Sequence, residues 1–297
     1  MEQLTSCLIC GSQKISHYLT CKDHFLTSEI FSIQQCNNCG FVFTNPRPEA
    51  SELGNYYKSA EYISHSNAKK GAFNSIYQII RQYTLSRKFK LIKQLSAGEK
   101  ILDIGCATGE FLNYMKIHGW QTTGIEPDPS VRENAIRNYG LEVYDEAGIQ
   151  NLKDESFDVI TMWHVLEHVS DLNGRMTELN RLLKPDGFIL IAVPNQNSAD
   201  AKHYGEFWAA YDVPRHLYHF SAESIKSLFQ KHDFTLEKIL PMKFDAYYVS
   251  LLSEKYASGK MNWIRGFWNG FCSNLAACKK NNHSSLIFIG KKKRARL

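Results

Sequence analysis

Four cysteines near the N-terminus form two closely spaced pairs. Each pair follows the pattern Cys-x-x-Cys-Gly, with Cys7 and Cys10 in the first pair and Cys36 and Cys39 in the second. Four thiolates complete the tetrahedral shell that Zn²⁺ prefers and leave no open position for a substrate. A redox dithiol is the alternative, but the thioredoxin-like unit that usually accompanies one is missing. We therefore predict a structural zinc site. The other cysteines are expected to be free thiols: Cys21, Cys106, Cys272 and Cys278.

A glycine-containing turn, Asp103-Ile-Gly-Cys-Ala-Thr-Gly109, follows an apolar run. Glycines at such a turn let the backbone approach a ligand beyond the carboxyl end of a strand. The Asp103 carboxylate would repel a dinucleotide pyrophosphate but attract the cationic amino acid of S-adenosylmethionine. Glu126, roughly 20 residues further on, would accept hydrogen bonds from ribose hydroxyls. The turn therefore favours S-adenosylmethionine as cofactor. The residues expected to bind it are Asp103, Gly105, Cys106, Gly109, Glu126, Glu146, Ala147 and Trp163.

Histidines and an acid gather in two further segments. His164, Glu167 and His168 would share one face if a helix began at residue 164, and His216 and His219 lie in a long loop. Methyl transfer needs an acceptor held in line and a group that removes its proton, a role that suits a near-neutral imidazole. We expect His164 or His216 to be the base, with Glu167 stabilising the imidazolium. Hydrogen-bonded, purely structural histidines are the alternative.

Alternating strand-type and helix-type runs must position these residues. From residue 100 onward this alternation predicts βαβ units and a parallel sheet. The expected strands are 101–104, 122–125, 141–143, 159–163, 188–193, 234–240 and 285–289. The expected helices are 110–118, 130–139, 175–183, a helix capped by Ser221 that ends near 231, and segments at about 245–257 and 261–279. Pro185-Asp186-Gly187 predicts a tight turn before the fifth strand.

The ordered motifs resemble those of class I methyltransferases of the type 11/23-like subgroup. The resemblance covers about residues 99–195 and rests on the glycine turn, Glu126, Ser156-Phe-Asp158 and Leu183-Lys-Pro-Asp-Gly187. Trp163-His-x-Leu-Glu-His168 together with Pro214-Arg-His-x-Tyr-His-Phe-Ser221 is similar to bacterial members that often carry a Cys-rich N-terminal module. The resemblance implies an α/β, Rossmann-like fold with a seven-stranded, mostly parallel sheet, and a methyltransferase activity that depends on S-adenosylmethionine.

Three regions are expected along the chain. Residues 1–48 read as a zinc-ribbon-like module that ends at closely spaced prolines, and 49–96 as a helical connector or lid. Residues 97–297 read as the methyltransferase domain, with a helical insertion at about 244–280 that caps the substrate. An aromatic-rich stretch around Trp208 and Tyr211 suits either a substrate lid or core packing.

The expected reaction is methyl transfer to a hydroxyl, and less readily to an amine or carbon, of a small or sugar-linked acceptor. One alternative is a non-catalytic scaffold that binds S-adenosylmethionine and docks a partner through its zinc module. Another is a metal-assisted RNA 2′-O-methyltransferase, because the histidine segments resemble its Glu-x-x-Glu-His motif plus a later His, although His164 replaces the first Glu. In that alternative the metal ligands would be His164, Glu167, His168 and one of His216 or His219.

Charge and hydropathy limit the partners. A net charge of +5 is modest for 297 residues, and residues 1–40 contain only Lys14 and Lys22 as basic side chains, so a nucleic-acid partner is not expected. No run reaches the roughly 18 apolar residues that span a membrane, and the N-terminus lacks the pattern of a secretory signal. We therefore expect a cytoplasmic protein without a membrane partner. The segment 261–268 could form a homodimer contact or the roof of the pocket.

Overall fold

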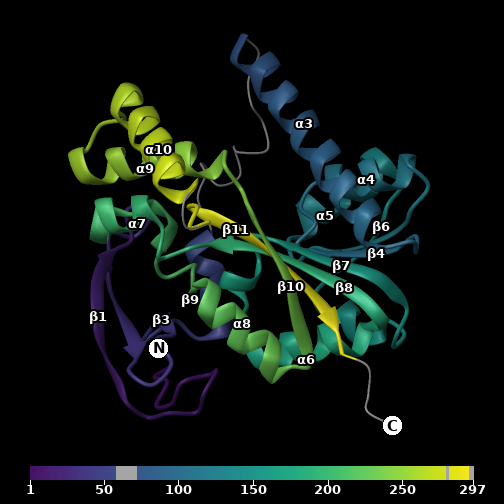
Figure 1. Cartoon of the computed structure of the whole chain (residues 1–297), viewed down its shortest axis with the longest axis horizontal. Coiled ribbons are helices and arrows are strands. Elements are labelled where there is room, and N and C mark those ends of the chain that lie inside the picture. The colour runs from purple at the N-terminus through teal and green to yellow at the C-terminus, as the bar shows by residue number, and fades with distance from the viewer. Residues whose placement is uncertain (58–71, 279–280, 294–297) are drawn as a thin grey trace. The chain divides into compact units, whose positions relative to one another are not determined.

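The computed structural model describes residues 1–57, 72–278 and 281–293 (Figure 1). The chain divides into two compact units. Unit 1 comprises Met1–Lys58, His164–Met176 and Ile191–Ile289, and unit 2 comprises Ser59–Trp163, Thr177–Leu190 and Gly290–Leu297. Within the described ranges, every helix is too short or too polar to cross a lipid bilayer.

Strands and helices alternate through most of the described chain. The strands are β1 (Ile15–Lys22), β2 (Ile30–Cys36), β3 (Val42–Thr44), β4 (Lys100–Ile104), β5 (Gln121–Ile125), β6 (Glu142–Tyr144), β7 (Phe157–Trp163), β8 (Leu183–Pro194), β9 (Tyr218–His219), β10 (Phe234–Pro241) and β11 (Ser285–Lys292). The α-helices are α1 (Ala50–Leu53), α3 (Ala72–Leu95), α4 (Glu110–Ile117), α5 (Pro129–Tyr139), α6 (Leu172–Leu182), α7 (Ala199–Tyr204), α8 (Ala222–Lys231), α9 (Asp245–Ser258) and α10 (Trp263–Cys278). Short 3-10 helices are η1 (Gly54–Tyr57), η2 (Ala147–Asn151), η3 (Leu166–His168), η4 (Gly205–Phe207) and η5 (Ala209–Tyr211).

The larger sheet has seven strands in the order β10-β11-β8-β7-β4-β5-β6 and is mostly parallel. Each of the seven strands predicted from the sequence is present, so the α/β, Rossmann-like fold class is confirmed. Strand β4 pairs in parallel with β5 on one side and with β7 on the other. The strand order therefore reverses beside β4, and ligands of such sheets bind at the carboxyl ends of the strands at this switch point.

Local sequence signals explain where the helices of this sheet begin and end. The Asp128 side chain accepts hydrogen bonds from the backbone N–H groups of Ser130 and Val131, at 2.8 and 3.0 Å, and Pro129 occupies the first turn of α5. Gly140 ends α5 in the left-handed region, with φ of 57°. In α8, Ser221 is the predicted N-cap and accepts from the N–H of Ser224.

One predicted boundary is wrong. The expected tight turn at residues 185–187 lies within β8, which already begins at Leu183. Asp186, and not Gly187, takes the positive φ of 63°. A Cβ on Gly187 would lie only 2.7 Å from Cγ of Leu183 and 3.0 Å from the carbonyl oxygen of Lys184. Glycine is therefore required at residue 187 because the chain packs closely against Leu183 and Lys184, and not because of a left-handed backbone.

The smaller sheet belongs to unit 1 and has the order β1-β2-β3-β9. Strand β3, from the cysteine-rich segment, pairs antiparallel with β9, so that Val42 faces His219 and Phe43 faces Tyr218. The N-terminal strands therefore share a sheet with a segment far along the chain. The predicted domain boundaries after residues 48 and 96 stay predictions, and residues 58–71 of the predicted connector lie outside the described residues.

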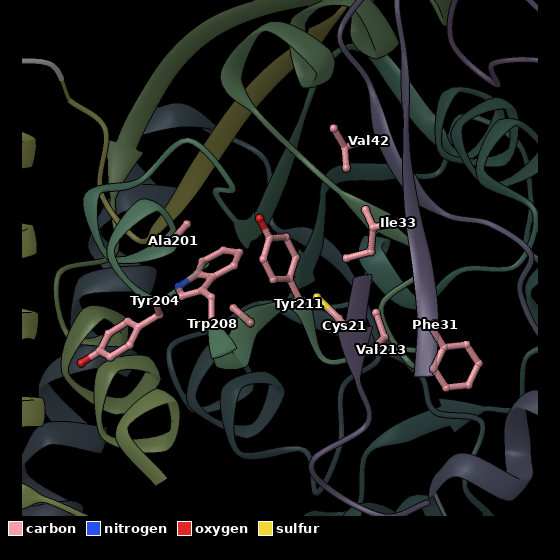
Figure 2. Close-up of a cluster of buried hydrophobic side chains, with 10 residues drawn as sticks. Cys21, Phe31, Ile33, Val42, Ala201, Tyr204, Trp208, Tyr211 and Val213 are labelled. Atoms are coloured by element: carbon pink, nitrogen blue, oxygen red, sulfur yellow. The ribbon is translucent and has the colours of Figure 1, made fainter. Parts of the chain in front are cut away.

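Aromatic side chains of the long loop after β8 form part of the core of unit 1. Figure 2 shows Trp208 and Tyr211 beside Cys21 and Ile33, which come from β1 and β2. Trp208 is buried, and its indole N–H donates to Asp200 Oδ2 at 2.8 Å. Of the two interpretations left open for this aromatic stretch, core packing describes Trp208 and Tyr211.

Helices α9 and α10 stand between β10 and β11, where the sequence predicts two helical segments, and they lie side by side (Figure 1). The close packing depends on glycine, because a Cβ on Gly270 would lie 2.8 Å from Cα of Tyr247. The opposite side of α10 leaves large apolar side chains exposed, Trp268 to 64%. A homodimer through this segment stays a prediction.

Candidate functional site

The four predicted zinc ligands lie together in unit 1. One sulfur from each of Cys7, Cys10, Cys36 and Cys39 lies within 4.8 Å of the other three, and the Sγ atoms of Cys7–Cys39 and Cys10–Cys36 are 3.5 Å apart. Tetrahedral zinc with bonds of about 2.3 Å separates its sulfurs by about 3.8 Å. The cluster therefore has the size of a zinc site with four cysteine ligands, and all four thiols are present as free cysteines.

The two cysteine pairs adopt the same backbone turn. The N–H of Gly11 donates to the carbonyl of Cys7 at 2.9 Å, and the N–H of Gly40 donates to the carbonyl of Cys36 at 2.8 Å. Both glycines have positive φ, 75° and 74°. The left-handed region explains why glycine follows the second cysteine of each pair.

The glycine turn of unit 2 begins at the carboxyl end of β4. Gly105 and Gly109 have φ of 72° and 82°, and the N–H groups of Gly105 and Cys106 both donate to the carbonyl of Ile125, at 2.8 and 3.0 Å. A Cβ on Gly109 would lie 2.6 Å from Cδ1 of Leu141, so only glycine fits this position. The thiol of Cys106 is buried, and a contact of Cys106 with the cofactor stays a prediction.

Two carboxylates flank this turn. Asp103 is 2% exposed and its Oδ1 accepts a hydrogen bond of 2.5 Å from the hydroxyl of Thr161 on β7. Burial raises the pKa of Asp103 to about 7. Glu126 directly follows β5 and accepts from the N–H groups of Ala107 and Asp128, at 2.9 and 3.0 Å. Burial also raises the pKa of Glu126. The structure therefore brings both predicted acids to the carboxyl ends of adjacent parallel strands.

The ring of Trp163 forms a cation–π contact with a lysine. The Nζ of Lys88, on α3, lies 3.8 Å from the centroid of the Trp163 ring, and Phe111 packs edge-on against the same ring at 5.7 Å. The buried indole N–H of Trp163 has no hydrogen-bond partner among the described residues. Lys88 also lowers the pKa that burial raises at Asp103. Sequence reasoning missed Lys88, because its position in α3 carries no motif.

The two predicted cofactor residues that follow β6 are exposed. Glu146 and Ala147 stand at the beginning of η2, after β6. The Asp145 carboxylate accepts from the N–H of Gly148 at 2.9 Å and fixes this turn. The cofactor contacts of Glu146 and Ala147 stay predictions.

In unit 1, His164 lies between two carboxylates. Its Nε2 is 2.9 Å from Asp245 Oδ2 and its Nδ1 is 3.4 Å from Glu167 Oε1. Burial by itself would lower the pKa of His164, but the two carboxylates outweigh it and raise the pKa to about 10. His164 has φ of 58°, which no helix contains, so the helix considered from residue 164 is not formed and only η3 follows. Asp245, at the start of α9, carries no sequence signal for this pairing.

Glu167, His168 and His216 form the second cluster of potential metal ligands among the described residues. One ligand atom of each lies within 4.8 Å of the others. The Nδ1 of His168 contacts the carbonyl of Arg215 at 3.1 Å and the hydroxyl of Tyr57 at 2.8 Å. Burial, with a further contribution from His216, lowers the pKa of His168 to about 4. The Glu167 side chain is fully buried.

His219 does not join this cluster. It lies in β9, and its Nε2 is 3.1 Å from the hydroxyl of Thr44. Burial, together with the nearby His216, lowers its pKa well below the usual value. Of the five predicted catalytic residues, the structure therefore groups three, places His164 beside them through its contact with Glu167, and gives His219 a hydrogen bond that ties β9 to β3.

The neighbouring Arg215 holds the loop of His216 in place. Its Nη2 forms ion pairs with Asp23 Oδ1 at 2.8 Å and with Asp212 Oδ1 at 2.7 Å. Arg215 and Asp23 are both buried, so the loss of either partner would leave an uncompensated buried charge between the N-terminal segment and the loop.

Comparisons with known proteins agree with this architecture. Residues 77–239 match a family model described as a methyltransferase domain. A ubiquinone biosynthesis O-methyltransferase of Haemophilus ducreyi is 34% identical over 111 residues, which are 33% of this chain and 47% of the relative. One of Vibrio atlanticus is 29% identical over 138 residues, 43% of this chain and 56% of the relative. The matches thus span about half of these relatives.

A solved structure of similar fold is phosphoethanolamine N-methyltransferase 2 of Haemonchus contortus in complex with S-adenosyl-L-methionine. It superposes with a TM-score of 0.52 at 16% identity and covers 94% of this chain and 69% of its own. At this identity the likeness concerns the fold alone.

Proposed function

The chain belongs to the methyltransferase-domain family, and on that premise we propose that it transfers the methyl group of S-adenosylmethionine to a hydroxyl of a small or sugar-linked acceptor. One observation carries the cofactor part of this proposal. Asp103 and Glu126 end two adjacent parallel strands beside a turn whose glycines leave its backbone open to a ligand.

The charges of this turn suit S-adenosylmethionine better than a dinucleotide. Asp103 is a buried acid at the end of β4, next to the turn. In its ionised form it attracts the cationic amino acid of S-adenosylmethionine and repels a pyrophosphate. Glu126, held by two backbone N–H groups, keeps lone pairs for the ribose hydroxyls.

The hydroxyl acceptor is supported by the relatives and by the histidine cluster. The matched relatives are named O-methyltransferases, and a hydroxyl must lose its proton during transfer. His164 is a poor proton acceptor, because two carboxylates hold it in the charged form near neutral pH. We assign the handling of that proton to Glu167, His168 and His216, whose side chains offer acceptor atoms.

A calorimetric titration of the zinc-loaded chain with S-adenosylhomocysteine tests the cofactor site. We expect micromolar binding that Glu126→Ala abolishes. Glu133→Ala is the matched control, because Glu133 is an exposed acid of α5 whose nearest ion pair is with Arg137 at 3.8 Å, and it should bind as the wild type does. A wild-type chain that does not bind the ligand would reject the proposal.

A turnover assay then separates an enzyme from a scaffold. Release of S-adenosylhomocysteine is measured with S-adenosylmethionine and a panel of phenols, sugar-linked hydroxyls, amines and a short RNA. Turnover restricted to hydroxyl acceptors of the small-molecule set is the expected result. Tight cofactor binding without turnover of any acceptor would favour the scaffold, and turnover of the RNA alone would favour the 2′-O-methyltransferase.

A further inference from the structure

Glu167 is an unusual carboxylate within unit 1. Both of its oxygens are buried, and neither has a hydrogen-bond partner among the described residues. The ion pair that it forms with His164 is long, at 3.4 Å, and His164 is shared with Asp245 at 2.9 Å. A fully buried carboxylate costs roughly several kcal/mol in an apolar surrounding unless a charge compensates it, so a second cation at Glu167 would be stabilising.

The two imidazoles near Glu167 each place Nδ1 beside a backbone carbonyl oxygen. The Nδ1 of His216 lies 2.8 Å from the carbonyl oxygen of Ala210, and the Nδ1 of His168 lies 3.1 Å from that of Arg215. Because a carbonyl oxygen can only accept, the Nδ1 of His216 carries the proton and donates it to Ala210. The Nδ1 of His168 can donate to Arg215 in the same way, and it also contacts the hydroxyl of Tyr57 at 2.8 Å. In the tautomer that donates from Nδ1, the Nε2 of each ring offers a lone pair. One potential ligand atom from each of Glu167, His168 and His216 lies within 4.8 Å of the other two.

The same arrangement is typical of metal-binding histidines. A ligating imidazole donates its second N–H to a backbone carbonyl or carboxylate, which fixes the ring orientation and makes the other nitrogen more basic. Both His168 and His216 show this partner, on carbonyls of the loop that also supplies His216. The N–H of Leu217 donates to the carbonyl of Glu167 at 2.8 Å and holds the loop against η3.

We propose that Glu167, His168 and His216 form a second metal site, distinct from the cysteine cluster, for a divalent transition-metal ion such as Zn²⁺. Two imidazole nitrogens and one carboxylate are ligands that Zn²⁺, Co²⁺ and Fe²⁺ accept, and three protein ligands leave a position for an oxygen donor. Ligands at about 2.1 Å from a tetrahedral ion lie about 3.4 Å apart, so the observed spacing of up to 4.8 Å closes through small side-chain rotations.

The neighbouring histidines are excluded from this site by their own partners. Both ring nitrogens of His164 face carboxylates, and the Nε2 of His219 is bonded to Thr44. Asp212 Oδ2 lies 4.0 Å from the Nε2 of His216, beyond hydrogen-bonding distance, while Oδ1 of the same carboxylate pairs with Arg215. The ligand set therefore differs from the four-residue set that the sequence suggested.

The existence of the site does not depend on the proposed function, but its role in the reaction does. If the acceptor hydroxyl binds at the open position, the ion lowers the pKa of that hydroxyl and makes the loss of its proton to solvent easier. In that case the three side chains act on the proton through the ion and do not accept it themselves. Metal binding and methyl transfer are measured separately, so either can fail alone.

Cobalt titration of the zinc-loaded wild-type chain tests the site. We expect one additional Co²⁺ per chain, seen by calorimetry and by elemental analysis, with d–d absorption but without the sulfur-to-metal charge-transfer bands of a thiolate site. Glu167→Gln and His216→Ala should weaken cobalt binding at least tenfold. His203→Gln is the control, because His203 is exposed and outside the cluster, and it should leave binding unchanged.

The zinc of the cysteine cluster serves as an internal test of folding. A variant that keeps one zinc per chain and binds S-adenosylhomocysteine like the wild type is folded, so its loss of cobalt is specific. Should both variants fail to fold, the anomalous signal of cobalt in crystals of the wild type locates the ion. No second ion per wild-type chain at millimolar cobalt, an ion at other residues, or unchanged binding in a folded Glu167→Gln variant would overturn the proposal.

Discussion

Binding of S-adenosylhomocysteine should depend on pH through Asp103. This acid is buried and its pKa is raised to about 7. The ligand ammonium is attracted only to the ionised carboxylate, because the protonated acid has no charge. Binding should therefore weaken as pH falls through 7, and the ligand should displace a proton when it binds below pH 7.

The size of the effect follows from the fraction of ionised Asp103. With a pKa of about 7, roughly one molecule in eleven carries the charge at pH 6 and about ten in eleven at pH 8. The Kd should thus be about tenfold larger at pH 6, a difference of about 1.4 kcal/mol. Asp103→Asn should remove this dependence and bind weakly at both values.

A substitution of Thr161 provides a second test of the role of Asp103. Its hydroxyl donates to Asp103 Oδ1 and favours the ionised form, so Thr161→Val should move the midpoint of the pH dependence upward. Thr122→Val, on β5, is the matched control and should leave the midpoint unchanged. Calorimetry between pH 5.5 and 8.5, repeated in buffers of different ionisation enthalpy, measures both Kd and the released proton. A Kd that varies less than twofold over this range in the wild type would refute the reasoning.

Three further changes test the packing around the sites. Gly109→Ala should lower the free energy of unfolding in urea by about 1–3 kcal/mol more than Gly119→Ala does. Both glycines have positive φ, but only the Cβ added at residue 109 would clash with neighbouring atoms. Equal losses in the two variants would contradict this. Cys36→Ser should reduce the bound zinc, measured by elemental analysis, and lower the melting temperature, because metal binding and folding are coupled. Full zinc content in the variant would argue against the site. Arg215→Met leaves the buried Asp23 uncompensated and should cost about 3–5 kcal/mol of unfolding free energy, whereas a loss under about 1 kcal/mol would show that the ion pair is unimportant.

The sequence alone was sufficient where the signal is local. The glycine turn, the acid after the next strand and the order of strands and helices all follow from periodicity and turn chemistry among near neighbours. The two Cys-x-x-Cys-Gly pairs likewise specify their own backbone turns, so the four-cysteine cluster was predicted in full. These features depend on conformational preferences of a few consecutive residues.

Tertiary structure alone decided the partners of the histidines. His164 meets Asp245 from a helix far along the chain, and this carboxylate adds to the effect of the nearby Glu167 and helps to keep His164 charged. The protonated nitrogen of His216 is set by the carbonyl of Ala210, whose direction depends on the path of the loop and not on any side chain. Trp208 likewise became part of a core only because β1 and β2 pack against it. Such properties arise from packing between distant segments and from backbone orientation, and residue types and spacing do not encode either one locally.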